Sequence, residues 1–281
     1  MKPNPNSAQP PGNRPAREKL DISAAAVQPL PSPPQFVSDA GALGIEFEPG
    51  DVEKLGLYLA LLMKANETQN LTAIRDAAEA WRRHILDSLT LLPALAEFPE
   101  GSRVIDVGSG GGLPGLPLAI VMPHIGFTLL EATSKKCDFL TQAAARLGLS
   151  NVKVLCGRSE RVAQDRGVRA DSFGTVTHTG GHREAYDAVV SRAVGRLATL
   201  VELTAPLCRI GGSVLLIKGE KADEELKEAE RAMHLLKVVH VETLPTPTGR
   251  IVILEKRSAT PRDYPRADGE PARAPLGVTT E

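Results

Sequence analysis

The stretch VIDVGSGGGLPGLPLAI, from Val104 to Ile120, carries the strongest structural signal in the chain. Its apolar start is typical of a strand and includes an acidic residue, Asp106, and four glycines follow between Gly108 and Gly112. The apolar segment after them can form a helix. A glycine loop between a strand and a helix lets the backbone approach a ligand closely and directs helix N–H groups toward it. The stretch therefore predicts a cradle for a nucleotide-like cofactor.

Strand and helix patterns alternate from residue 103 onward. Strands are expected at residues 103–107, 127–131, 152–156, 186–192 and 212–218, and helices near Leu113 and Arg158 and at residues 134–148, 197–206 and 222–236. This alternation predicts an α/β fold whose mostly parallel, doubly wound sheet has helices on both faces. Two late strands, 238–244 and 250–256, can pair as an antiparallel hairpin. A closing hairpin is typical of Rossmann-like class I methyltransferases, whereas dinucleotide dehydrogenases usually end in another parallel unit.

The segments before this alternation differ in character. Residues 1–36 are rich in Pro, Asn, Gln and Ser and show no periodicity, so we expect a disordered tail. Residues 37–100 are expected to form an N-terminal helical element. Its first helix spans 51–65, behind an N-cap at Asp51, and its second spans 77–95.

The cofactor-binding domain is expected to span residues 101–256. Within it, residues 165–184 have no periodicity and are interpreted as a surface insertion. Residues 257–281 are expected to form a loose C-terminal tail.

Composition narrows the class of protein. No apolar run reaches the roughly 18 residues of a membrane helix, and the N-terminus lacks the apolar core of a secretory signal, so we expect a cytoplasmic protein. Cys137, Cys156 and Cys208 lack metal-ligand spacing and are expected to be reduced thiols, so no metal is expected. The net charge is −1, so any binding of nucleic acid would depend on a local basic surface.

Two classes of cofactor fit the glycine loop. Gly110, Gly112 and Gly115 match the dinucleotide pattern G-x-G-x-x-G, which keeps an NAD(P)-dependent oxidoreductase as an alternative. Asp106 favours S-adenosylmethionine, because a carboxylate at that position helps to hold the amino-acid end of this cofactor; its alternative role is to cap the following helix. Glu131 is expected to accept hydrogen bonds from ribose hydroxyls with either cofactor.

Six segments then resemble one family. They are NLTAIRD (70–76), RRHILDSL (82–89), DVGSGGGLPGLPLAI (106–120), LLEATSKKCDFL (129–140), VVSRAV (189–194) and GGSVLLIKG (211–219). In this order they resemble the RsmG (GidB) family, which methylates N7 of a guanine in small-subunit (16S) ribosomal RNA. The resemblance covers roughly residues 40–256 without the 165–184 insertion.

The resemblance implies a set of cofactor contacts. Carried across by motif, these contacts are Gly108, Leu113, Ser159, Glu160 and Arg192, which join Asp106, Gly110 and Glu131. Ser159 and Glu160 follow the third strand, where a methyltransferase reads the adenine. Arg192 is expected to position the target guanine, so that Arg192→Ala would lose methyl transfer far more than stability. The alternative is a structural arginine paired with Glu131 or Glu160.

Guanine N7 carries a free lone pair and loses no proton on methylation, so no general base is required. Catalysis is expected to depend on positioning and on the exclusion of water. Candidate RNA contacts are Arg82, Lys135, Lys136 and Arg196, and the expected partner is 16S ribosomal RNA or the small subunit. A non-catalytic ribosome-assembly factor with a ligand pocket stays open as a further alternative.

Overall fold

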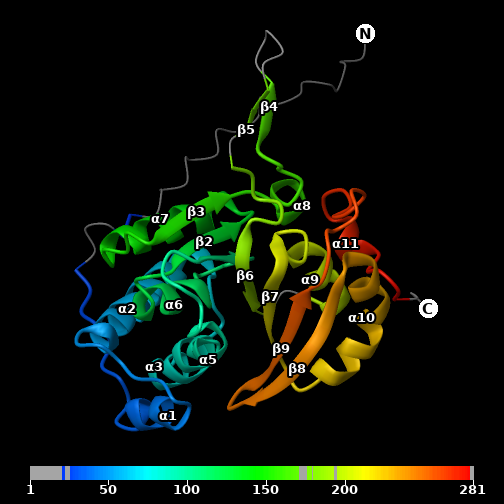
Figure 1. Cartoon of the computed structure of the whole chain (residues 1–281). Helices are drawn as coiled ribbons and strands as arrows, with labels where there is room; N and C mark the ends of the chain where they lie inside the picture. Colours follow the sequence, from blue (N-terminus) through cyan, green and yellow to red (C-terminus); the bar gives the residue numbers. More distant parts are fainter. Residues whose placement is uncertain (1–20, 23–25, 171–175, 179, 193–194, 279–281) are drawn as a thin grey trace, which may run out of the picture.

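A seven-stranded sheet forms the centre of the molecule in the computed structural model, which describes residues 21–22, 26–170, 176–178, 180–192 and 195–278 (Figure 1). The strand order is β3-β2-β1-β6-β7-β9-β8. The parallel strands are β1 (Arg103–Val107), β2 (Gly126–Glu131), β3 (Val152–Cys156), β6 (Tyr186–Arg192) and β7 (Cys208–Lys218). β9 (Gly249–Lys256) is antiparallel to both β7 and β8 (Val238–Thr246). The expected α/β class with a terminal hairpin is confirmed.

The strand order predicts where a ligand would bind. The chain runs outward from β1 through β2 to β3, then returns to the other side of β1 for β6 and β7. The connections therefore diverge between the carboxyl ends of β1 and β6, and ligands of open α/β sheets bind at such a switch point. The glycine loop follows β1, and Arg192 ends β6.

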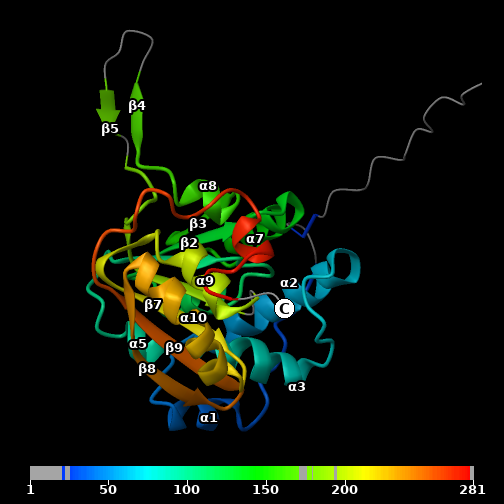
Figure 2. The same ribbon diagram turned by 90° about the vertical axis from the view of Figure 1, so that its right-hand side faces the viewer.

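Two hydrophobic cores cover the two faces of the sheet. Alternate strand residues point to opposite faces, so Val104 packs in one core and Ile105 in the other. The first core contains α6 (Gly115–Val121), α7 (Ser134–Arg146) and the N-terminal helices. The second contains α9 (Leu197–Thr204) and α10 (Ala222–Leu236), which lie in front of β7 and β9 in Figure 2.

The N-terminal element consists of several short helices around one long one. These are α1 (Phe36–Ala42), α2 (Asp51–Gln69), α3 (Ala77–Ala80), the π-helix η1 (Trp81–Leu86), α4 (Asp87–Leu89) and α5 (Leu92–Leu95). The single helix expected over 77–95 is thus divided by a π-helix and by a turn before Pro93. Within the described residues, no helix has the length and apolar content to cross a membrane.

The start of α2 differs from the expectation that Asp51 is its N-cap. Gly50 occupies the N-cap with a φ of 94°, and no side chain caps this end of the helix. Asp51 is the first helical residue, and its carboxylate accepts the N–H of Glu48 at 3.0 Å. A left-handed N-cap favours glycine because a Cβ is strained there.

Part of each expected tail packs on the domain. The N–H of Leu30 donates to Gly56 O at 3.1 Å, and a Cβ on Gly56 would overlap the Leu30 carbonyl. Leu30 thus lies against α2, and Val27 and Leu30 pack on the first core, while residues 1–20 and 23–25 lie outside the described residues. At the other end, Arg266 pairs at 2.7 Å with the fully buried Glu202 of α9. Residues 257–278, which include α11 (Glu270–Arg273), are therefore held on the second core.

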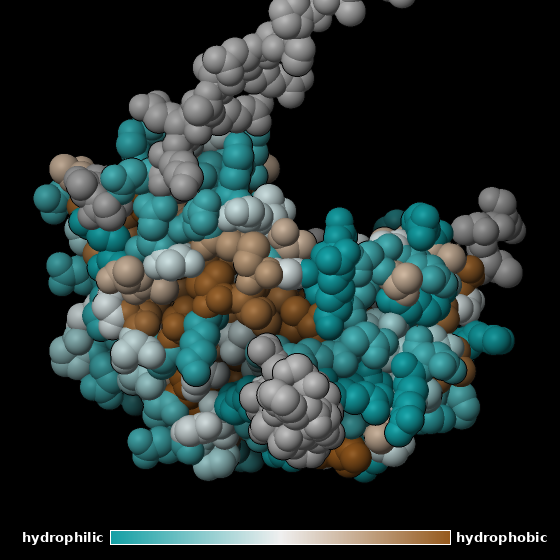
Figure 3. Space-filling view, turned by 90° about the horizontal axis from the view of Figure 1, so that it is seen from above, coloured by the Kyte–Doolittle hydropathy of each residue, from teal (hydrophilic) through white to brown (hydrophobic). Residues whose placement is uncertain are grey.

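The 165–184 segment contains a separate small sheet. β4 (Val168–Ala170) and β5 (Val176–His178) pair antiparallel and project from the body, whereas residues 171–175 and 179 lie outside the described residues (Figures 1 and 2). In the view from above, hydrophobic side chains gather on the left of the face, on the side where Figure 1 places β2 and β3 (Figure 3). β3 is an edge strand there, and its apolar residues are only half-buried.

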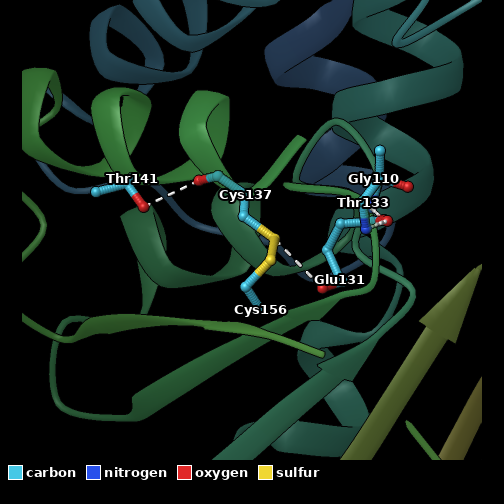
Figure 4. Close-up of a disulfide and its surroundings, with 6 residues drawn as sticks. All are labelled: Gly110, Glu131, Thr133, Cys137, Thr141 and Cys156. Atoms are coloured by element: carbon cyan, nitrogen blue, oxygen red, sulfur yellow. Dashed lines mark hydrogen bonds between the residues drawn. A yellow bond between two sulfur atoms is a disulfide. The ribbon is translucent and has the colours of Figure 1, made fainter. Parts of the chain in front are cut away.

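Cys137 and Cys156 form a disulfide, so the expectation of reduced thiols is wrong for this pair (Figure 4). Cys137 lies in the first turns of α7, after β2, and Cys156 ends β3. Because β2 and β3 are parallel neighbours, their carboxyl ends meet, and the two Cα atoms are 5.8 Å apart. Cys208 remains a free, buried thiol.

The Cys137–Cys156 disulfide predicts how many cysteines react with a thiol reagent before and after reduction. Purified without reductant and then unfolded, the protein should show one reactive thiol per chain, Cys208, and after reduction all three cysteines should react. A thiol reagent with an optical readout measures both values. The control variant Cys208→Ala should show no reactive thiol before reduction, and three thiols in the unreduced wild type would contradict the disulfide.

Candidate active site

The glycine loop between β1 and α6 is shaped by left-handed residues. Gly108, Gly110 and Gly112 have φ values of 76°, 57° and 95°, which side chains rarely adopt. A Cβ at Gly112 would overlap the side chain of Leu116, whereas the space beside Gly110 is open. The N–H of Gly108 donates to Leu130 O at 2.9 Å, which ties the loop to β2. Half-buried backbone is therefore presented to the crevice at Gly110.

Glu131 at the end of β2 holds the loop through its carboxylate. Its Oε2 accepts the N–H of Gly110 at 3.0 Å, and its Oε1 accepts the N–H of Thr133 at 2.8 Å. Figure 4 shows the side chain beside Gly110, with the disulfide on its other side. The Sγ of Cys137 lies 3.3 Å from the carbonyl oxygen of Glu131. The carboxylate is buried and sits directly against the cradle.

One carboxylate oxygen of Asp106 accepts a hydrogen bond, and the other is left without one in the described part of the chain. Its Oδ2 accepts the N–H of Gly115 at 3.0 Å, so the side chain does cap the start of α6. Its Oδ1 is buried and has no hydrogen-bond partner in the described part of the chain. Burial raises the pKa of Asp106 to about 7, against the opposing effects of the Gly115 N–H, the nearby Ser109 hydroxyl and, last, the Arg192 guanidinium. A buried acceptor without a donor is a place where a ligand or an ordered water can bind.

Tyr58 supports the back of the loop, and sequence reasoning missed it. Its hydroxyl donates to Gly111 O at 2.8 Å, and burial raises its pKa. A Cβ on Gly111 would contact the side chains of Leu62 and Leu71. The long helix α2 therefore packs directly on the cradle. The only sequence signal was a tyrosine in an otherwise apolar helical stretch.

Ser159 and Glu160 begin α8 (Ser159–Val162), after β3. The Ser159 hydroxyl donates to Leu203 O at 2.6 Å, and Glu160 Oε1 accepts the N–H of Gly269 at 2.8 Å. Next to Gly269, Asp268 forms an ion pair with Arg161 at 2.7 Å. The C-terminal segment thus holds Glu160, which the expectation of a loose tail did not foresee.

Arg192 is held by the N-terminal element rather than by Glu131 or Glu160. Its Nη1 donates to Arg83 O at 2.6 Å and to Asp87 Oδ2 at 3.0 Å. The second Asp87 oxygen accepts from the hydroxyl of Thr248, in the β8–β9 turn. Three distant segments therefore meet at one carboxylate. The Arg192 and Asp87 side chains are only 15% and 8% exposed, so the pair is largely desolvated.

His84 completes the surroundings of this pair. Its Nδ1 lies 3.4 Å from Arg192 Nη2, and its Nε2 lies 2.7 Å from the hydroxyl of Thr72. Burial, and next the Arg192 charge, lower the pKa of His84 to about 4, so the ring is neutral near pH 7. It serves as a structural hydrogen-bonding residue.

The expected site residues fall into groups. Asp106, Gly108, Gly110 and Glu131 lie around one loop, with Leu113 at its end. The expected RNA contacts are not joined in this way: Arg82 lies in η1, Lys135 and Lys136 begin α7, and Arg196 precedes α9. These four share no hydrogen bond or ion pair with one another in the described part of the chain. All except the half-buried Lys136 are exposed.

Removal of either member of the Arg192–Asp87 pair should lower the stability of the fold. Asp87→Ala leaves a desolvated guanidinium without its carboxylate, so it should lower the free energy of unfolding by about 3 kcal/mol, measured by urea denaturation. For the same reason Arg192→Ala should cost stability as well, because Asp87 is then unpaired. As control, Glu79→Ala removes the exposed pair with Arg83 and should cost less than about 1 kcal/mol. Equal losses for Asp87→Ala and Glu79→Ala would contradict this.

Comparison with known proteins identifies the family. Residues 51–251 match the family model described as rRNA small subunit methyltransferase G (GidB). A ribosomal RNA small subunit methyltransferase G from Sorangium cellulosum is 45% identical over 251 residues, 89% of this chain and 99% of that protein. Proteins of the same name from Roseiflexus castenholzii and Moorella thermoacetica are 40% and 38% identical over 242 residues each, 84% and 83% of this chain and 97% and 93% of theirs.

These matches agree with the resemblance of the six sequence segments and confirm a methyltransferase that uses S-adenosylmethionine. Neither the NAD(P)-dependent oxidoreductase nor the non-catalytic assembly factor finds support in them. With its glycine loop at the switch point of a sheet that ends in an antiparallel hairpin, the chain belongs to the rRNA small subunit methyltransferase G (GidB) family.

Proposed function

We propose that this protein transfers a methyl group from S-adenosylmethionine to N7 of a guanine in 16S ribosomal RNA of the small subunit. The relatives at 38–45% identity are each named for small-subunit ribosomal RNA. The structural observation that supports the proposal most is the glycine loop, held by Glu131 and Asp106 at the switch point of the sheet. A cytoplasmic location follows from this substrate.

The residues present fit the cofactor. The spare Asp106 Oδ1 would interact with its amino-acid end, directly or through a water molecule, beside the open backbone of Gly110. Each oxygen of Glu131 accepts one backbone N–H and keeps a second lone pair for the ribose hydroxyls. Ser159, Glu160 and Leu113 would surround the adenine, with Glu160 held by the C-terminal segment.

The chemistry requires positioning rather than proton transfer. S-adenosylmethionine supplies, when bound, a methyl group on a sulfonium sulfur that is open to nucleophilic attack. Methylation at N7 would use the free lone pair of that nitrogen, and no proton would leave the base. No side chain of this protein is therefore assigned as a general base. Rate would come from alignment of N7 with the methyl group and from exclusion of water.

Arg192 is the positioning residue of this proposal. Arginine carries five N–H donors, and two hydrogen bonds from Nη1 fix the guanidinium to Asp87 and to the Arg83 carbonyl. Its remaining donors can bind the O6 of the target guanine. An A-form major groove is too narrow for a side chain to reach N7, so the target should be an unpaired or flipped base. Arg82, Lys135, Lys136 and Arg196 would contact the surrounding RNA.

The first test is methyl transfer itself. Small subunits or 16S ribosomal RNA that lack the modification should gain one N7-methylguanosine when incubated with the protein and S-adenosylmethionine. Mapping of the modified nucleotide by chemical cleavage and mass spectrometry identifies it. Heat-unfolded protein is the control. Methylation at another atom, or tight binding of NADH without methyl transfer, would contradict the proposal.

A second test uses the titration of Asp106. With a pKa of about 7, this carboxyl is protonated below pH 7 and ionised above it. The ammonium of the cofactor favours the ionised form, so binding near pH 7 should release protons from Asp106, and affinity should rise as the pH increases through the pKa of this carboxyl. Titration calorimetry in buffers of different ionisation enthalpy measures both.

Asp106→Asn is the matched control for this linkage, because its amide oxygen can still accept the N–H of Gly115. In that variant the cofactor should bind more weakly, and the part of the proton release that Asp106 causes should vanish. Equal proton release by the wild type and Asp106→Asn would show that Asp106 does not contact the cofactor.

A further inference from the structure

A groove lies beside the Arg192–Asp87 pair, between the N-terminal element and the β8–β9 turn. It encloses about 600 Å³, within the range of small-ligand sites. Its walls include Phe36 of α1, Trp81, Arg82 and Arg83 of η1, and Pro247 and Thr248 of the turn. Figure 1 shows α1 and the β8–β9 turn at the same, lower end of the molecule. The groove is distinct from the glycine loop, none of whose residues line it.

The groove offers hydrogen-bond donors. Arg82 is exposed, and within the described residues its guanidinium makes only a long contact, 3.5 Å, with Pro247 O, so its donors are available to a ligand. Trp81 contributes to the groove wall, but its Nε1–H is buried away from the groove surface and has no acceptor among the described residues, so it is not counted as a donor to a ligand. Of the two acidic side chains in the lining, Glu79 is paired with Arg83 at 3.3 Å, and Asp39 is exposed. The Arg82 guanidinium suits an anionic ligand with hydrogen-bond acceptors, such as the phosphate of a nucleotide.

The groove shares its wall with Arg192. Thr248 lines it and donates to Asp87, the carboxylate that holds Arg192. Arg83 also lines it, and its carbonyl accepts from Arg192. The β8–β9 turn lies at the carboxyl end of β7, where Arg250 pairs with Lys218, and thus on the same edge of the sheet as the end of β6. An RNA strand with its target guanine at Arg192 would therefore run past this groove.

We propose that the groove is a second RNA subsite, which binds an unpaired nucleotide next to the target guanine, with Arg82 on its phosphate. The proposal rests on the proposed function, because it requires the target base to lie at Arg192. The π-helix then has a role: η1 presents the Arg82 side chain to the groove and the Arg83 carbonyl to Arg192. Flanking sequence would be selected on this side of the target.

Two variants test the groove, one through its charge and one through its shape. Arg82→Gln removes the charge of an exposed side chain, with Arg75→Gln, exposed outside the groove, as control. Ala78→Trp fills the groove without a change of charge, with Ala96→Trp, exposed elsewhere in the N-terminal element, as control. Binding of S-adenosylmethionine by each variant verifies that it is folded.

The readouts are the KM for ribosomal RNA and the salt dependence of RNA binding. Ala78→Trp should raise the KM about tenfold, which corresponds to about 1.4 kcal/mol, and the Ala96→Trp control should not. Arg82→Gln should reduce the slope of log K against log salt by about 0.7, the value for one lost contact to a single-strand phosphate. Arg75→Gln should leave the slope unchanged.

The outcomes separate this inference from the function. If the wild type methylates guanine N7 and both groove variants match their controls, the groove is no RNA subsite, although the function stands. If the wild type does not methylate N7, the proposed function itself fails. A defect on assembled small subunits but not on naked RNA would mean that the groove contacts a ribosomal protein, and this would also overturn the inference.

Discussion

The site depends on a glycine loop whose backbone is held by polar side chains from three elements. Glu131 of β2 accepts the N–H of Gly110, Asp106 of β1 accepts the N–H of Gly115, and Tyr58 of α2 donates to the carbonyl of Gly111. A loop rich in glycine has high conformational freedom when unfolded, so these contacts compensate for a large entropy cost. They also explain why two carboxylates are buried beside a loop that has no charge of its own.

A second polar network joins the N-terminal helices to the sheet. Asp87 accepts hydrogen bonds from Arg192 and Thr248, which lie 105 and 161 residues away in sequence. This places η1 against the carboxyl edge of the sheet, between the end of β6 and the β8–β9 turn. The helical element therefore contributes to the crevice as well as covering the first core. Since the pair is largely desolvated, its geometry matters to both the fold and the site.

Much of the fold could be predicted from the sequence. The bounds of β1, β3, β6 and α10 agree with the alternation of apolar residues, because strands and helices impose periods of two and 3.6 on buried positions. The 77–95 region was predicted less well. Over six residues, the spacing of apolar side chains in a π-helix is too similar to that in an α-helix for the sequence to distinguish them. The Cys137–Cys156 bond was missed because the two residues belong to different elements and are 19 apart.

The sequence by itself determined the class of fold, the glycine cradle and the family, because these depend on local patterns and on motifs in a given order. Only the tertiary structure decided the partners of the charged groups. Arg192 pairs with Asp87 instead of Glu131 or Glu160, and Glu160 is held by Gly269 of a segment expected to be loose. Hydrogen bonds and ion pairs require approach within about 3 Å. For residues about a hundred positions apart, that approach is set by how the sheet edge, the N-terminal helices and the C-terminal segment pack together.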